Sequence, residues 1–276
     1  MAKRYANLLK DVNGILSEQY RKYEKQGKLT YEEMAKYQRL EKLLKEVSEQ
    51  INEHDIEMRK EIHVLLNDQY KESYYRAAWI LETSAAAKLA YTTVKDEVID
   101  EAINSVFTGL TLNERLERRR YEIIISMRES ITRGLVEGQT YGQMSAEIKK
   151  VLEGDLVKAN RIVRTESKRI RETGALNSVK HAESKGIIMK KKWRTVADER
   201  VRNTHKKLDG VTLDIDEKFK IEGTDYKAEA PTMFGVASLD INCRCYLTYE
   251  IVAVERPEHE DLADLTYAEW QKERLG

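Results

Sequence analysis

Apolar residues recur every three or four positions through the first half of the chain, which is the spacing of one face of an α-helix. Between residues 40 and 65 they form a narrow stripe, and Glu and Lys fill most of the other positions. Such a stripe favours a coiled-coil or hairpin seam over deep burial in a globule. A long helix is predicted here, beginning at Thr30, because Thr30 and Glu33 have the spacing of a capping box. The stripe consists of Leu40, Leu43, Leu44, Val47, Ile51, Met58, Ile62 and Leu65.

The rest of the first half continues the helical pattern. A shorter helix is expected over residues 5–23, and a second helical block over 70–152 with breaks at 108–109 and 138–142, where glycines interrupt the pattern. Within that block, the arginine run 118–120 is expected to lie on a solvent-exposed helix face.

The pattern changes after residue 157. A basic helix is predicted over 157–181, followed by strands over 192–196, 211–215 and 243–251, the last with alternating apolar and polar positions. The predicted fold class is therefore α+β. A long helical region, resembling a hairpin or coiled coil, covers residues 1–157, and a small α+β domain with an antiparallel sheet covers 158–254. An acidic tail over 255–276 carries Trp270, which is expected to dock on a partner or on the domain itself.

The composition limits the class of protein. Charged residues make up 35% of the 276 positions, with 48 Lys and Arg against 48 Asp and Glu. No apolar run approaches the ~18 residues that a membrane-spanning helix needs, and the N-terminus lacks the apolar segment of a secretory signal. Two cysteines exclude a disulfide scaffold. A soluble protein without a membrane span is expected.

The neutral total hides a segregation of charge. Residues 158–207 carry 16 Lys and Arg against 5 Asp and Glu, whereas residues 208–276 carry 7 against 16. The basic block is a plausible surface for the phosphates of double-stranded DNA, bound without sequence preference. The alternative, equally open, is that it pairs with the acidic segment of its own chain. The candidate DNA-binding residues are Arg161, Arg164, Lys168, Arg169, Lys190, Lys191 and Lys192.

The best candidate for a chemical site combines His205 with Cys243 and Cys245. Thiolates and imidazole are the groups that hold zinc in four-coordinate sites. The fourth ligand could be Asp240, Asp198 or His181. The alternative is that both cysteines are half-buried and behave as small apolar residues.

An enzyme is the main rival from another class. Cys243 with His205 could form a nucleophile–base pair, and His205 with Asp198 or Glu166 could serve a toxin-like nuclease or hydrolase. No phosphate-binding loop motif and no nucleophile-elbow motif occurs in the sequence. A protein that is not an enzyme is therefore favoured.

Several short motifs follow one another in the second half of the chain. Arg164-Thr165-Glu166 lies in the basic helix, and Trp193 to Arg202, His205, Leu208-Asp209-Gly210, Pro231, Phe234-Gly235 and Asn242-Cys243-Arg244-Cys245 come after it. This series resembles the phage Mu F-like minor head proteins, also called phage head morphogenesis proteins. The specific resemblance covers roughly residues 120–252.

The resemblance implies a structural role in the head of a tailed phage or prophage. Such proteins associate with the portal protein and enter the procapsid in a few copies, after assembly in the host cytoplasm, and some are thought to bind DNA or leave the head with it. The N-terminal helices would then bind the portal or other copies of the chain. In related toxins this domain delivers a toxin domain fused C-terminally, and the short tail here gives no expectation of such a fusion.

The sequence departs from the family pattern around the candidate metal site. Many members carry Cys-x-x-Cys before the Leu-Asp-Gly motif and a histidine ahead of Cys-Arg-Cys, where this chain has Arg202, His205 and Asp240. His205, Asp240, Cys243 and Cys245 could still form a zinc site. Alternatively, Arg202 replaces the metal with a salt bridge to Asp240 or Asp198. The remaining motif residues are assigned to holding the domain together: Trp193, Asp198, Arg200, Arg202, Asp209 and Gly210.

Overall fold

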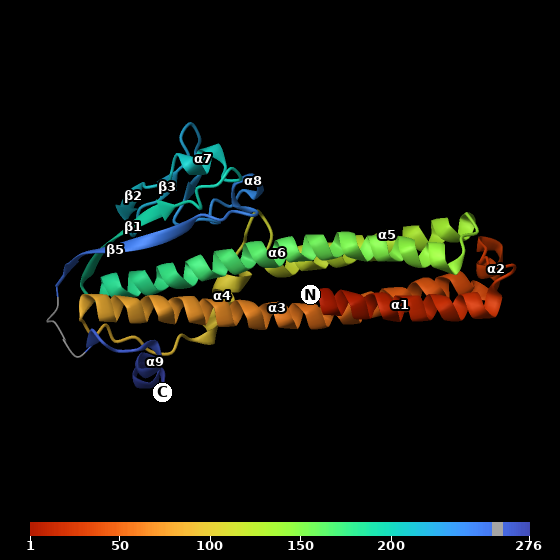
Figure 1. Cartoon of the computed structure of the whole chain (residues 1–276), viewed down its shortest axis with the longest axis horizontal. Helices are drawn as coiled ribbons and strands as arrows, with labels where there is room; N and C mark the ends of the chain where they lie inside the picture. The colour runs from red at the N-terminus through yellow and green to blue at the C-terminus, as the bar shows by residue number, and fades with distance from the viewer. Residues whose placement is uncertain (256–261) are drawn as a thin grey trace. The chain divides into compact units, whose positions relative to one another are not determined.

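The computed structural model describes residues 1–255 and 262–276 (Figure 1), and it confirms a mixed α+β fold dominated by helices. The α-helices are α1 (Ala2–Tyr23), α2 (Tyr31–Ala35), α3 (Arg39–Ala85), α4 (Asp96–Asn104), α5 (Leu112–Val136), α6 (Tyr141–Ser184), α7 (Asn203–Lys206), α8 (Ala237–Asp240) and α9 (Tyr267–Leu275), and η1 (Lys36–Gln38) is a 3-10 helix. The strands are β1 (Ile187–Arg194), β2 (Thr212–Asp214), β3 (Phe219–Lys220), β4 (Lys227–Ala228) and β5 (Tyr246–Val254). Within the described part, no helix has a stretch both long and apolar enough to cross a bilayer.

The chain forms two compact units that do not follow the linear division expected at residue 157. The helical unit comprises residues 1–62 and 113–162, and the mixed unit comprises 63–112 and 163–276. The division differs because α3 and α6 are each continuous and contribute one part to each unit.

In the helical unit, the apolar stripe is buried much as its spacing predicts. Five of its members between positions 43 and 58 are buried, and so is Ile62. Thr30 accepts a hydrogen bond from the Glu33 amide, as a cap should. The helix that it caps is the five-residue α2, however, because Tyr37 adopts a left-handed φ of 54° and interrupts the chain before α3 begins. The prediction of one helix running from Thr30 was therefore wrong.

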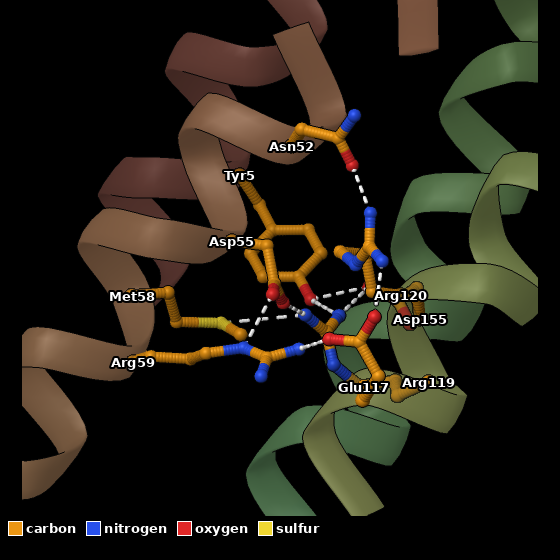
Figure 2. A network of polar contacts seen from close by, with 9 residues as sticks. All are labelled: Tyr5, Asn52, Asp55, Met58, Arg59, Glu117, Arg119, Arg120 and Asp155. Atoms are coloured by element: carbon orange, nitrogen blue, oxygen red, sulfur yellow. Dashed lines mark hydrogen bonds and ion pairs between the residues drawn. The ribbon is translucent and has the colours of Figure 1, made fainter. Parts of the chain in front are cut away.

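A buried arginine joins the helices of this unit (Figure 2). Arg119 of α5 is only 4% exposed and donates a 2.6 Å hydrogen bond to Asp55 of α3. It also pairs with Asp155 of α6 and donates to the hydroxyl of Tyr5 from α1. The expectation of a wholly exposed arginine face was wrong at this position. Through these contacts, one cation joins α1, α3, α5 and α6. Asp55 also accepts a hydrogen bond from Arg59 of its own helix at 2.6 Å.

The mixed unit contains a three-stranded antiparallel sheet in the order β2-β1-β5 and a separate β3-β4 ribbon. β1 is central, with Lys191 opposite Leu213 of β2 and Tyr249 of β5. The predicted strand at 192–196 lies in the same place but begins earlier, at Ile187. Trp193 of β1 is fully buried, in ring contact with Phe219 and Phe234.

The C-terminal helix α9 packs against the end of α3 within the mixed unit, so the tail contacts its own chain but not only the 158–254 segment on which it was expected to dock. Trp270 is fully buried and donates to the Glu82 carboxylate at 2.8 Å. Glu82 also accepts from Arg274 and from the Leu89 amide, so this buried carboxylate holds α9 and the segment after α3. Residues 256–261 of the expected tail lie outside the described part.

Replacing Arg119 tests the network in the helical unit. An Arg119→Met variant leaves the buried Asp155 without its cation and leaves Asp55 with Arg59 alone, so we expect a loss of about 3–5 kcal/mol in the free energy of unfolding at pH 7. The loss should shrink at acidic pH because protonation removes the unpaired charges. Urea unfolding monitored by circular dichroism measures both effects.

The matched control is Arg118→Met. The Arg118 side chain is 74% exposed and, among the described residues, its ion pair is with Glu122 on the same helix. We expect a change of at most about 1 kcal/mol in that variant. Equal losses in the two variants would contradict a special role for Arg119.

Candidate metal centre and its basic surroundings

Three residues expected to share a site meet in the mixed unit. His205 lies on α7, and Cys243 and Cys245 lie in the segment that enters β5. The His205 Nδ1 atom is 3.6 Å from the Cys243 sulfur and 3.5 Å from the Cys245 sulfur. The three ligand atoms all lie within 4.8 Å of one another, and all three residues are buried. Nitrogen and sulfur ligands of a tetrahedral zinc ion are separated by about 3.6 Å, so this spacing fits a metal.

The surrounding fold holds His205 in place. Its ring packs edge-on against Trp193, with centroids 5.6 Å apart, and lies against Phe234. α7 lies in the loop between β1 and β2. Backbone hydrogen bonds join the two ends of this loop, and in one of them the Gly210 amide donates to the Trp193 carbonyl. Gly210 has a φ of 83°, which glycine adopts without strain, and the Asp209 carboxylate accepts from the Thr195 amide. Contacts of Trp193, Asp209 and Gly210 therefore help to hold this loop in place.

Two buried thiols beside an imidazole share their protons unequally. Hydrogen bonds from Cys245 and His205 hold the pKa of the Cys243 thiol well below its usual range. The bond to Cys243 together with burial raises the pKa of the Cys245 thiol. The His205 Nε2 atom is buried without a hydrogen-bond partner. One ionised sulfur with a second sulfur and a nitrogen is a donor set suited to a soft divalent metal.

The residues considered as a fourth ligand are engaged elsewhere. Asp240 lies outside the group of three, because its two carboxylate oxygens accept from the Phe234 and Val236 amides at 3.1 Å each. His181 contacts the Leu89 carbonyl, and Asp198 pairs with Arg244. Among the described residues, the protein thus brings three ligands together.

The salt bridge considered as a substitute for the metal is not formed in the part of the chain that is described. Arg202 donates to the Ile241 carbonyl at 2.6 Å instead of pairing with Asp240 or Asp198. Asp198 accepts from the Arg200 amide as well as from Arg244, so it fixes the loop before α7.

Two of the proposed DNA-binding residues are buried and have partners inside the protein. Arg169 is 5% exposed, pairs with Glu166 at 2.7 Å and donates to the Ala102 carbonyl. Lys191 is fully buried and donates to the Ile215 carbonyl, and burial lowers its pKa to about 8. Neither side chain is available to a phosphate, so the expectation of DNA contact does not fit these two positions.

The other candidates divide into paired and unpaired side chains. Lys168 pairs with Glu172, and Lys190 pairs with Asp214. Arg161 and Arg164 are exposed and Lys192 is half-buried, with no ion pair for these three in the described part. The block therefore combines both alternatives: Lys190, like Lys180 and Lys207, pairs with the acidic segment after residue 207, and other cations stay free.

A basic hollow of about 880 Å³ lies beside the candidate metal centre. Its described lining contains six cationic residues and no carboxylate, and Cys243 forms part of its wall. Charge counting along the sequence did not reveal it, because the cationic residues come from three separated segments. Its lining is Gln69, Arg164, Thr165, Ser167, Lys168, Arg171, Arg200, Arg202, Asn242, Cys243 and Arg244.

Comparisons with known proteins agree with the motif pattern. The family model described as "Phage Mu protein F like protein" matches residues 126–248. The chain is also 34% identical to "Minor head protein GP7" of Bacillus phage SPP1, over 99% of this chain and 91% of that protein. The chain belongs to the Mu F-like family of minor head proteins. This membership supports a structural role in a phage head.

A second relative of this Mu F-like protein has a different description. The chain is 34% identical to "NAD(+)--arginine ADP-ribosyltransferase EFV" of Enterococcus faecalis, over 75% of this chain but 43% of that protein. The match therefore leaves more than half of the relative unaligned. No solved structure matches the chain.

The contacts of the Mu F-like domain give the nuclease alternative no support. His205 directs Nδ1 at the two cysteines, Asp198 pairs with Arg244, and Glu166 pairs with Arg169. The carboxylates of the nuclease alternative are thus paired with arginines, whereas Cys243 and His205, the candidate nucleophile–base pair, lie 3.6 Å apart.

Proposed function

We propose that this protein is a structural minor head protein of a tailed phage or prophage, which associates with the portal protein inside the procapsid. It would be made in the host cytoplasm, enter the head, and aid head morphogenesis, DNA packaging or DNA ejection. The observation that carries the proposal is the similarity to minor head protein GP7 over nearly the whole of both chains. A likeness over 99% of this chain includes the N-terminal helices, which lie outside the family-model match.

The helical unit is the part proposed to bind the portal protein. The large apolar side chains that are more than half exposed there include Tyr121 and Ile125, one turn apart on α5. Tyr121 and Ile125 line a hollow of about 640 Å³. Exposed apolar side chains grouped beside a hollow are typical of protein-binding surfaces. Self-association through the same helices is the second candidate, because another copy of the chain could cover these residues equally well.

Co-expression with the portal protein of the same phage tests this assignment. We expect the protein to sediment with portal rings, and Tyr121→Lys/Ile125→Lys to lower the bound fraction at least about tenfold, because charged side chains at the centre of an interface resist desolvation. Binding of the protein to itself in the absence of portal rings would instead support self-association.

The matched control replaces two exposed apolar residues of the mixed unit, Ile188→Lys/Val252→Lys. This variant should sediment like the wild type. Loss of binding in the control alone would move the portal surface to the mixed unit, and no sedimentation of the wild type with the rings would contradict portal association.

We also propose that the mixed unit contacts packaged double-stranded DNA without sequence preference. Its exposed cations without carboxylate partners support this proposal, since neutralising phosphates releases bound counterions. Arg164 and Lys192 remain candidates, together with Arg161 of the helical unit, whereas Arg169 and Lys191 are withdrawn because both are buried.

The His205, Cys243 and Cys245 group is proposed to hold a zinc ion. The donor set and its spacing support this proposal, and water or another small ligand would complete four-coordination. A metal would join α7 to the segment entering β5 and would stabilise a domain whose main sheet has three strands.

A metal assay of the purified protein tests the zinc proposal. We expect about one zinc per chain after expression with added zinc, and loss of that zinc together with a lower unfolding temperature in Cys243→Ser/Cys245→Ser. His181→Gln is the matched control, because it removes another imidazole of this unit and should retain the metal. A well-folded wild type free of metal would instead identify the two cysteines as apolar core residues.

A further inference from the structure

The structure assigns a phosphate-binding site to the basic hollow beside Cys243. We infer that the hollow holds adjacent phosphate groups of a nucleic-acid backbone, through the guanidinium groups of Arg164, Arg171 and Arg200. This inference deepens the proposed DNA contact and rests on it, but it places the contact at one site that the run of basic residues did not indicate.

The charge of the hollow points to an anionic ligand. It is lined by five arginines and one lysine without any carboxylate. Arg164, Arg171 and Arg200 have no ion pair among the described residues, and Arg164 and Arg171 lie two turns apart on α6. Like charges held this close repel one another, and a bound polyanion removes that repulsion. Arginine also presents a planar fork that matches phosphate oxygens.

The other three cations are fixed by contacts within the protein. Lys168 pairs with Glu172, Arg202 donates to the Ile241 carbonyl, and Arg244 pairs with Asp198. These contacts hold one side of the hollow in place before any ligand arrives. A site ordered in this way binds with less loss of side-chain freedom.

An unpartnered polar atom gives independent support. Thr165 lines the hollow, is 4% exposed, and its buried Oγ1 atom has no hydrogen-bond partner among the residues that the structure describes. A threonine inside a helix commonly bonds the carbonyl one turn earlier, so an unpartnered hydroxyl here is a donor left for a ligand. Ser167 and Asn242 add further polar groups to the lining.

The volume allows more than a single phosphate ion. At about 880 Å³ the hollow is within the range of sites for small organic ligands. Phosphate groups in series occur both in a nucleic-acid strand and in a free polyphosphate. The role proposed for a head protein favours the nucleic acid, and the experiment separates the two sources.

The test measures binding of a fluorescent 20-base-pair DNA duplex to the full chain by anisotropy, at several salt concentrations, with calorimetric titration of sodium triphosphate alongside. The hollow variant is Arg164→Gln/Arg171→Gln/Arg200→Gln. The control, Arg194→Gln/Lys220→Gln/Lys227→Gln, removes three exposed positive charges that lie outside the hollow and outside the proposed DNA contact. Thermal unfolding of each protein verifies its fold.

We expect the hollow variant to bind the duplex at least about 30-fold more weakly than the wild type. The slope of log K against the logarithm of the salt concentration should become shallower by about 2 to 3. The control should stay within about threefold of the wild type. A charge-preserving variant, Arg164→Lys/Arg171→Lys/Arg200→Lys, should lose several-fold because lysine lacks the guanidinium fork. It keeps the test valid if the glutamine variant unfolds.

Equal weakening in the hollow variant and the control, or none in the hollow variant, would overturn the site and leave the DNA contact standing. Triphosphate binding without duplex binding would support the hollow, with a free polyphosphate as its ligand, and would refute the DNA contact. A wild type that binds neither would refute both, whereas portal association is tested separately by sedimentation.

Discussion

The pairing of buried charges is the constraint on which this fold depends. More than a third of the residues are charged, and several of them are buried within a largely apolar interior. Arg119 is an example, because its guanidinium pairs with Asp55 and Asp155, donates to the Tyr5 hydroxyl, and so connects four helices directly. Removing charges from water is costly, and each buried ion therefore needs a partner at a defined position. The partners of Arg119 reach its guanidinium when the helices of the helical unit are aligned in one register. Apolar contacts alone would fix that alignment less strictly.

The mixed unit follows the same rule. Arg169 pairs with Glu166 inside the unit, and Glu82 is buried where Arg274, Trp270 and the Leu89 amide reach it. Arg164, Arg171 and Arg200, which have no ion pair in the described part of the chain, line the hollow beside Cys243. In this head protein, the paired buried charges stabilise the fold, and the unpaired cations are available to a binding partner.

The sequence predicted the features that depend on local pattern. The spacing of apolar residues located α1 and the stripe of α3, and the alternation after Cys243 located β5. The chemistry of His205, Cys243 and Cys245 was sufficient to predict that they meet. The break at Tyr37 was missed, because a left-handed φ at a residue other than glycine leaves no clear sequence signal.

Features that depend on tertiary structure were not predictable in this way. Charge counting placed Arg169 and Lys191 on a DNA surface, although the fold buries both. Asp240 was a reasonable metal ligand by residue type, but two backbone amides occupy its oxygens. The hollow was missed because α6, the loop before α7 and the segment entering β5 meet only in the folded chain.

The most direct test of the account is to measure the protein in purified procapsids of the phage or prophage that encodes it. Quantitative mass spectrometry of procapsids, with the portal protein as internal standard, gives the number of copies per head. The account predicts a small and reproducible number of copies, absent from procapsids made without the gene. Procapsids that lack the protein, while it accumulates free in the same lysate, would contradict its assignment as a minor head protein.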